Sequence, residues 1–336
     1  MTDPTPLART RAPVPGSCAG MWADADRPAW GTASPARFWV ALEQPGAWGN
    51  RAFVESRLDP ALGAEIERVC ASVGGRALLM RSVTDKRLGR DGHVARRRVF
   101  VSGGMPSGRP WLLAGEIADP ADVLRLPFDA LAGADPAPAL QALPTLSRSE
   151  EAMLLVCTNG KRDACCSVLG RPVAVVAAGL RPGRVWECTH TGGHRFSPTA
   201  ISLPTGATLA RLTVDLAVEE IDAAGGRALA AGVTTREHLR GLSHLPPVLQ
   251  AADAYVRTSL GETDVTALDV VAVDLAPDPV AAESVIDVTH RDGRTWRVAV
   301  HKQFDDTALR KNSCTTGPVP AESWVVRERD DNRVLA

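Results

Sequence analysis

Four side chains that can bind a metal lie between residues 157 and 194, in a chain of 336 residues with seven cysteines and seven histidines. Cys157 and Cys166 occur in the stretch CTNGKRDACC, and His190 and His194 delimit HTGGH. Cysteine sulfur and histidine nitrogen bind zinc and iron–sulfur clusters. We therefore take these four residues as a candidate metal site whose function depends on the metal that they hold.

The two histidines are separated by TGG, which contains Gly192 and Gly193. Their i,i+4 spacing matches a helical metal-binding pair, but each glycine costs a helix about 1 kcal/mol relative to alanine. Glycine also allows left-handed backbone angles and the close approach of a bulky group. The motif therefore favours a tight loop beside an inorganic cluster, where backbone N–H groups can donate to the sulfides.

Three interpretations compete with a cluster. In the first, the cysteines are core residues and the histidines ordinary polar groups, since free cysteine is among the most buried residue types. In the second, the four residues form a Cys2His2 zinc site, although the cysteine half of such a site has a gap of two to four residues rather than eight. In the third, the vicinal pair Cys165 and Cys166 forms a thiol redox centre, although the pair lacks the Cys-x-x-Cys spacing.

The cluster interpretation is a [2Fe–2S] centre with two thiolates on one iron and two imidazoles on the other, the ligand set of Rieske centres. The Rieske pattern itself, Cys-x-His twice, is absent from the sequence. Imidazoles donate less charge than thiolates, so the potential should lie toward the Rieske range of about −150 to +300 mV rather than near −400 mV. We expect a one-electron carrier or relay, with proton coupling through ionisation of a ligated imidazole.

Basic residues flank the candidate ligands at Lys161, Arg162 and Arg195. Together with the glycine pair 192–193, they are candidates for contacts to the cluster. They are also candidates for steering an acidic redox partner. The alternative is that these cations are ordinary solvated loop charges.

The candidate ligands follow the ends of predicted strands. EAMLLVC is expected to be a buried strand ending at Cys157 and RVWECTH a second strand ending at His190, with a helix over RPVAVVAAGL between them. Functional groups commonly lie where strands give way to loops. Cys188 shares a strand face with His190, which makes it either an alternate ligand or, as we favour, a buried structural thiol.

The elements before the motif predict a small α/β unit. Strands are expected in ARFWVALEQ, RALLMRSV, RRRVFVSGG and PWLLAGEIA, with a helix over DPALGAEIERVCASVGG after the first strand. Asp59 is the expected cap of that helix, Pro60 its first residue and Gly74 its end. This order of elements is typical of a mixed sheet.

After the motif, two segments stand out. REHLRGLSHLPPVLQAADAYVRTSLG is predicted to be helical apart from its two prolines. ESVIDVTH and TWRVAVHKQF are predicted to form a hairpin, because Asp292-Gly293 between them is a strong turn signal.

The predicted organisation has four parts. Residues 1–35 form an extended segment, residues 36–147 an α/β unit, residues 148–240 the unit with the metal motif, and residues 241–336 an α+β extension. The boundary at 147 follows the Ala-, Pro- and Asp-rich stretch 129–146, the best linker candidate. No internal repeat is evident in the sequence.

Composition excludes several classes of protein. The net charge of −1 argues against a dedicated nucleic-acid binder, which would carry a concentrated basic excess. No stretch has the roughly 18 to 20 apolar residues of a membrane span, and the N-terminus lacks the apolar core of a signal peptide. Seven cysteines, an odd number, favour thiols or metal ligands in a reducing cytosol over disulfides. We therefore expect a cytoplasmic protein that binds neither nucleic acid nor membrane.

The metal motif resembles that of the sucrase/ferredoxin-like proteins. Their marks are a cysteine, Lys/Gln-Arg-Asp, a second cysteine, and later His-x-Gly-Gly-His followed by an aromatic or apolar residue. LEQPGAWG and RGLSHLPPVLQAA are weaker marks of the same family. The residues of this chain that match the motif are Cys157, Lys161-Arg162-Asp163, Cys166, His190, Gly192-Gly193, His194 and Phe196.

The resemblance implies a thioredoxin-like ferredoxin domain over residues 148–240, with two thiolate ligands, Cys157 and Cys166, and two imidazole ligands, His190 and His194. Cys165 is an alternative to Cys166, which the spacing favours. Residues 36–147 are then open to interpretation as a second, degenerate thioredoxin-like module, and the implied partner is a redox protein of unknown identity. The sucrose cleavage that the family name suggests would need a pair of spaced carboxylates, which the sequence does not identify.

Overall fold

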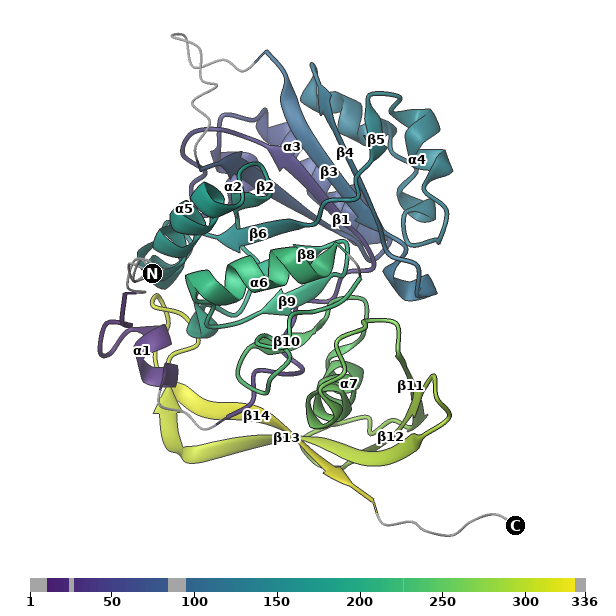
Figure 1. The fold of residues 1–336 in the computed structure, drawn as a ribbon. Helices are drawn as coiled ribbons and strands as arrows, with labels where there is room; N and C mark the ends of the chain where they lie inside the picture. Colours follow the sequence, from purple (N-terminus) through teal and green to yellow (C-terminus); the bar gives the residue numbers. More distant parts are fainter. Residues whose placement is uncertain (1–10, 24–26, 84–94, 226, 330–336) are drawn as a thin grey trace, which may run out of the picture.

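The structure is a computed structural model that describes residues 11–23, 27–83, 95–225 and 227–329 (Figure 1). Its main feature is a ten-stranded mixed sheet with the strand order β10-β9-β8-β6-β7-β2-β1-β3-β4-β5. A second, antiparallel sheet has the order β11-β12-β13-β14. The predicted class, α/β or α+β with a mixed sheet, is confirmed.

The first half of the large sheet has the predicted order of elements: β1 (Trp39–Glu43), α3 (Pro60–Ser72), β2 (Arg76–Ser82), β3 (Arg97–Gly103) and β4 (Trp111–Ile117). A short helix that was not predicted, α2 (Ala52–Glu55), precedes α3. β1 pairs in parallel with β2 and antiparallel with β3, and β3 pairs antiparallel with β4. The predicted start of α3 is confirmed, because the Leu62 N–H donates to the Asp59 side chain at 2.8 Å and Pro60 is the first helical residue.

A 3-10 turn, Met105–Ser107, joins β3 to β4. Short elements connect the two halves: the 3-10 turns Pro120–Arg125 and Phe128–Ala130, then α4 (Ala137–Ala142) and β5 (Leu146–Arg148). β5 pairs antiparallel with β4 at the edge of the sheet. The stretch 129–146 therefore contains regular structure and leads directly into the second half.

The second half repeats the connectivity of the first: β6 (Met153–Cys157), α5 (Arg171–Leu180), β7 (Val185–Cys188), β8 (Ala200–Leu203), β9 (Ala207–Leu209) and α6 (Val214–Ala224). β6 pairs in parallel with β7 and antiparallel with β8, and β8 pairs antiparallel with β9. The strand orders β2-β1-β3-β4 and β7-β6-β8-β9 thus match. The structure reveals a repeat of topology that the sequence does not display.

The segment around residue 240 is a strand rather than the predicted helix. β10 (Leu239–Leu242) pairs antiparallel with β9, and Gly241 within it has φ +142°, far from helical angles. The helical prediction is correct only from α7 (Pro247–Leu260), whose first residue is a proline that needs no N–H partner.

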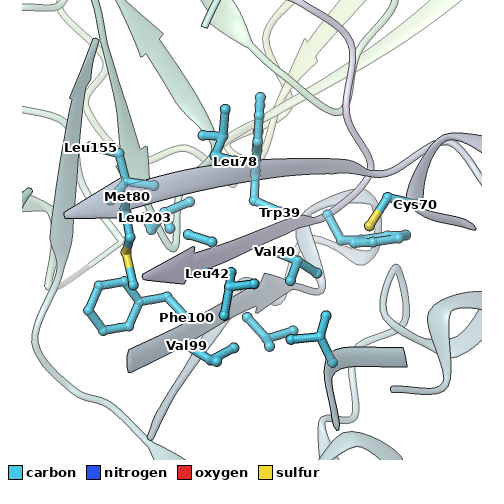
Figure 2. Close-up of a cluster of buried hydrophobic side chains, with 14 of the residues drawn as sticks. Trp39, Val40, Leu42, Cys70, Leu78, Met80, Val99, Phe100, Leu155 and Leu203 are labelled. Atoms are coloured by element: carbon cyan, nitrogen blue, oxygen red, sulfur yellow. The ribbon is translucent and has the colours of Figure 1, made fainter. Parts of the chain in front are cut away.

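An antiparallel pairing of β2 with β7 joins the two halves into one sheet, with Met80 opposite Cys188. The core beneath this junction is continuous. Figure 2 shows Trp39, Leu42 and Phe100 of the first half gathered with Leu155 and Leu203 of the second. Each such large apolar side chain contributes about 1.5–3 kcal/mol when fully buried.

The second sheet consists of β11 (Leu268–Asp274), β12 (Ser284–His290), β13 (Thr295–Arg310) and β14 (Val319–Glu328). The predicted hairpin is confirmed: β12 and β13 are antiparallel with Thr289 opposite Thr295, and Gly293 has φ +93°. α7 packs against all four strands of this sheet.

The N-terminal segment packs against the second sheet. Figure 1 shows α1 (Cys18–Ala23) beside the turn that joins β13 to β14. The indole of Trp22 donates to the carbonyl of Lys311 at 3.1 Å, and that of Trp30 donates to the carbonyl of Trp324 at 3.2 Å. Within the described ranges, no helix combines the length and apolar character that crossing a bilayer requires.

Candidate metal centre

Parallel pairing of β6 with β7 brings the first candidate cysteine and the first candidate histidine to one edge of the sheet. Cys157 is the last residue of β6 and lies opposite Cys188, the last residue of β7. His190 follows β7 by two residues. Because the carboxyl ends of parallel strands meet at the same edge, the loops that carry the other two ligands begin side by side.

The loop after β6 returns Cys166 to the vicinity of Cys157. The Asp163 N–H donates to the Asn159 carbonyl at 3.1 Å, and the Cys166 N–H donates to the Asp163 carbonyl at 3.2 Å. Cys166 begins a π-helical turn that continues into α5. Gly170 in this turn allows the close approach, because a Cβ there would lie 2.4 Å from the Cys157 carbonyl oxygen.

The Cys157 and Cys166 thiols are buried and interact directly. A hydrogen bond from Cys166, together with the N–H groups of Thr191 and Asn159, lowers the pKa of Cys157 to about 7 against the opposing effect of burial. The interaction with Cys157 and burial raise the pKa of Cys166 well above its usual value. Cys157 is therefore the more acidic thiol of the pair, and it has the backbone N–H donors that stabilise a sulfur ligand.

The two glycines of HTGGH form the predicted tight loop, with φ +81° at Gly192 and +68° at Gly193. A Cβ at Gly193 would lie 2.5 Å from the guanidinium carbon of Arg240. This buried guanidinium donates to the Gly192 carbonyl at 3.0 Å and to the Thr32 hydroxyl at 3.1 Å. A cation from β10 thus holds the turn in place.

The His190 and His194 rings stack, with centroids 4.4 Å apart and planes 24° from parallel. Burial lowers the pKa of His190 to about 3, and it lowers that of His194 despite the opposing charge of Asp163. Both rings are neutral at pH 7, which is the form that binds metals. The Cys166 sulfur lies 3.3 Å from His194 Nδ1, so the thiol pair and the ring pair adjoin.

The four predicted ligands adjoin in a chain of pairs, Cys157 with Cys166, Cys166 with His194 and His194 with His190. Among the described residues, the compact group of donor atoms within 4.8 Å of one another that includes any of them is Asp163, Cys166 and His194. The three flanking cations differ from one another. Lys161 and Arg162 are exposed on the ligand loop, and Arg162 donates to the Asn50 side chain at 2.8 Å. The Arg195 side chain is only 11% exposed and forms an ion pair with Glu322 at 3.1 Å. Of these three cations, only Lys161 and Arg162 are therefore accessible to the surface of a partner protein.

The first half of the sheet covers the ligand loop. The Asn159 side-chain amide donates to the Gly49 carbonyl at 3.0 Å, and that of Asn50 donates to the Lys161 carbonyl at 3.3 Å. The end of β1, which corresponds by topology to the end of β6, has Glu43 where β6 has Cys157. The first half thus supplies a cover and has no thiol at the matching strand end.

Two further residues shape the site although the sequence assigns them no role. The Asp163 carboxylate lies within 4.8 Å of the ligand atoms of Cys166 and His194. Asp163 is visible in the Lys-Arg-Asp motif, so a closer interpretation of that motif would have found it. Arg240 comes from a distant strand; it is the first residue of RGLSHLPPVLQAA, one of the weaker family marks, which by itself indicates no contact with the metal motif. Cys188 is fully buried and burial raises its pKa, as expected for the structural thiol that we favour.

This set of donors fits a [2Fe–2S] cluster. Two thiols lie together, two neutral imidazoles lie together, and N–H groups point at the Cys157 sulfur. A cavity of about 260 Å³ borders the turn at Gly193; its lining includes the cations Arg195, Arg240 and Lys302 and none of the four candidate ligands. The same donors also fit a single zinc ion.

A comparison with protein-family models finds one described as sucrase/ferredoxin-like, which matches residues 29–241. The match covers more than half of the chain, from the segment before β1 into β10. It contains the four candidate ligands, Asp163 and Arg240. No curated protein and no solved structure matches the chain significantly.

Proposed function

The chain belongs to the sucrase/ferredoxin-like family, and from this premise we propose that it holds a [2Fe–2S] cluster and transfers single electrons. The proposed ligands are Cys157 and Cys166 on one side and His190 and His194 on the other. The observation that carries the proposal is the pairing of like donors, sulfur beside sulfur and ring beside ring, at one edge of the sheet.

The protein's own residues would fix the ligands before any cluster arrives. The neutral imidazoles are already in the protonation state that binds iron, and Cys157 is the thiol that loses its proton more readily. The Thr191 and Asn159 N–H groups would continue to donate to the Cys157 sulfur. A bound cluster would supply a site that accepts and releases one electron.

The ligand type determines the expected potential. Two imidazoles in place of two thiolates leave the centre less negative, so we expect a midpoint well above about −400 mV. Coupling to protons at the imidazole ligands stays a prediction from the sequence, and the dependence of the midpoint on pH between 6 and 9 measures it.

Electron exchange needs a partner, which we propose to be an acidic redox protein in the cytosol. Lys161 and Arg162 support this proposal, because both are exposed on the loop that carries the cysteine ligands. Exposed charges act mainly on the rate of association and are screened by salt. A reaction rate that falls with ionic strength is the expected signature.

The alternative function is a zinc-stabilised structural or interaction module without redox activity. The same four donors favour it, since Cys2His2 sets commonly bind zinc. Colour separates the two: protein purified without oxygen should be reddish-brown with a cluster and colourless with zinc.

The decisive experiment measures iron and acid-labile sulfide in anaerobically purified protein. We expect about two of each per chain, lost in Cys157→Ala and retained in Cys70→Ala, which removes an equally buried thiol from the first-half core. In His194→Cys the cluster should persist with a lower midpoint, because a thiolate replaces an imidazole. A colourless wild type with zinc bound by two sulfurs and two nitrogens would show the alternative to be correct.

A further inference from the structure

Three cysteines outside the ligand set of the proposed cluster converge on one point. Cys18 comes from α1, Cys165 from the loop after β6, and Cys314 from the turn between β13 and β14. Their sulfurs form a triangle with sides of 3.5 Å (18–165), 3.3 Å (165–314) and 3.5 Å (314–18). All seven cysteines of the chain lie in the described residues, and all are free thiols.

A carboxylate adjoins this triangle. The Asp163 oxygens lie 3.6 and 3.7 Å from the Cys18 sulfur. They also accept the N–H of Cys165 at 3.0 Å, the N–H of Cys314 at 2.7 Å and the Ser313 hydroxyl at 2.8 Å. Asp163 therefore fixes the backbone of two of the three cysteine-bearing segments and presents an oxygen to the third.

The adjacent residues Cys165 and Cys166 contact two different groups of side chains. Cys165 has helical angles, φ −59° and ψ −37°, and successive residues on a helix point about 100° apart. The Cys165 sulfur accordingly contacts Cys18 and Cys314, whereas the Cys166 sulfur contacts His194. Cys165 is thus a member of a second cluster of donors. Treating Cys165 only as an alternative to Cys166 as the iron ligand misses this second cluster.

The spacing of the sulfurs suits a single ion. A tetrahedral zinc with Zn–S bonds of about 2.3 Å holds its sulfurs about 3.8 Å apart, so the observed triangle would open by only a few tenths of an ångström. A [2Fe–2S] cluster takes two protein ligands on each iron, so it would hold at most two of these three thiolates on one iron and would separate the third. Cysteine sulfur and carboxylate oxygen are both ligands that zinc accepts in tetrahedral sites.

We propose that Cys18, Cys165 and Cys314 bind a Zn²⁺ ion, with an Asp163 oxygen as the fourth ligand. Cys18 and Cys165 pack with Ala19 and Leu169 in a buried apolar cluster, and Cys314 is only partly buried and provides the route of access. The ion would connect α1, the loop after β6 and the β13–β14 turn. It would therefore fix the loop that also carries Cys166.

The test combines metal content with the zinc environment in the full chain. Anaerobically purified protein is treated with a mild chelator and reloaded with Zn²⁺, and zinc and iron are counted per chain. X-ray absorption at the zinc edge should find three sulfurs at about 2.3 Å and one oxygen at about 2.0–2.2 Å. Two sulfurs with two nitrogens, or no retained zinc, would overturn the proposal.

Variants separate this site from the proposed cluster. Cys314→Ser, in an accessible turn, should weaken Zn²⁺ affinity more than about 100-fold in competition with a chromophoric chelator and leave the iron and sulfide content unchanged. Cys70→Ser is the matched control and should change neither. If Cys314→Ser keeps the zinc, the proposal is wrong; if the wild type holds this zinc but no iron, only the proposed function fails.

Discussion

The turn that carries His194 depends on glycine at residue 193. Its φ of +68° costs an L-residue roughly 1–2 kcal/mol, and its missing Cβ leaves room for the buried guanidinium of Arg240. Arg240 in turn donates to the Gly192 carbonyl. Both the backbone angle and the contact with Arg240 therefore require glycine at residue 193.

Gly193→Ala should destabilise the protein more than its backbone angle explains and impair metal loading. Gly108→Ala is the matched control, because Gly108 has φ +67° with open space around it. We expect Gly193→Ala to cost at least about 1 kcal/mol more in urea unfolding than the control, since Arg240 must move. Equal losses in the two variants would show that the contact with Arg240 has no effect.

The residues of the site divide into those that a local pattern reveals and those that it does not. Spacing, glycine content and strand ends pointed to Cys157, Cys166, His190 and His194, which the structure brings together. Arg195 looked like a loop cation but is held by Glu322 from β14. Such contacts join segments far apart in the sequence, so no window of sequence predicts them.

At the scale of elements, the junction between β2 and β7 depends on a largely buried ion pair. Arg81 Nε donates to Glu187 at 2.6 Å, and the Glu187 side chain is only 4% exposed. The Arg81 guanidinium also lies over the Trp48 ring at 4.2 Å. Arg171 approaches the same carboxylate less closely, at 3.6 Å.

Arg81→Ala should destabilise the chain by about 2 kcal/mol, because it leaves a buried carboxylate with its weaker partner alone. Arg68→Ala is the control, since Arg68 pairs with an exposed Glu65 and should change nothing measurable. Urea unfolding of both variants at pH 7 measures the difference. A null result for Arg81→Ala would mean that the junction holds by backbone pairing and apolar packing.

α6 contains a titrating group of a different kind. Burial raises the pKa of Glu220 to about 7 from an ordinary 4.5, although the Ala230 N–H donates to its carboxylate at 2.9 Å. A raised folded-state pKa means that the stabilising contribution of this group is complete below pH 4.5 and is lost as the pH rises through 7. Folding is therefore expected to weaken between these values.

Glu220→Gln should remove that loss. The variant keeps an acceptor for the Ala230 N–H but cannot ionise, so its stability relative to wild type should rise by at most about 3 kcal/mol between pH 4.5 and 8.5. Urea unfolding at several pH values in this range measures the change. A stability difference that stays constant with pH would contradict the assignment.

Most elements follow from periodicity and caps, and the failure at β10 has a physical reason. Leu239 and Leu242 have a helical spacing, which favoured a helix there. The segment instead pairs as a strand with the free edge of β9. Gln250 packs closely against it, since a Cβ at Gly241 would lie 2.8 Å from the Gln250 side chain. Tertiary pairing overrides a weak local preference in such short segments.

At the scale of the whole molecule, one topology occurs twice and the two copies share an edge. Pairing of β2 with β7 removes the strand edge that each copy would otherwise expose. The apolar core also crosses the junction, from Met80 and Phe100 to Leu155 and Leu203. The two copies differ at their matching strand ends, where β1 ends at Glu43 and β6 at Cys157.

Residues 148–336 expressed alone should aggregate, because β7 would present an open edge and the junction core would meet water. Coexpression with residues 1–147 should restore a soluble complex that unfolds cooperatively. Size-exclusion chromatography and thermal melts measure both states. A monomeric fragment with a sharp melt would instead show that the boundary at 147 separates independent domains.

The position of the β13–β14 turn late in the sequence determines when its cysteine is synthesised relative to the loop that it contacts. Cys314 follows Cys165 by 149 positions, so a growing polypeptide makes the loop after β6 long before the segment that closes over it. During that interval the Cys165 sulfur lacks the neighbour that Cys314 later supplies. The three sulfurs can therefore meet only after synthesis has reached the last hairpin and that hairpin has docked.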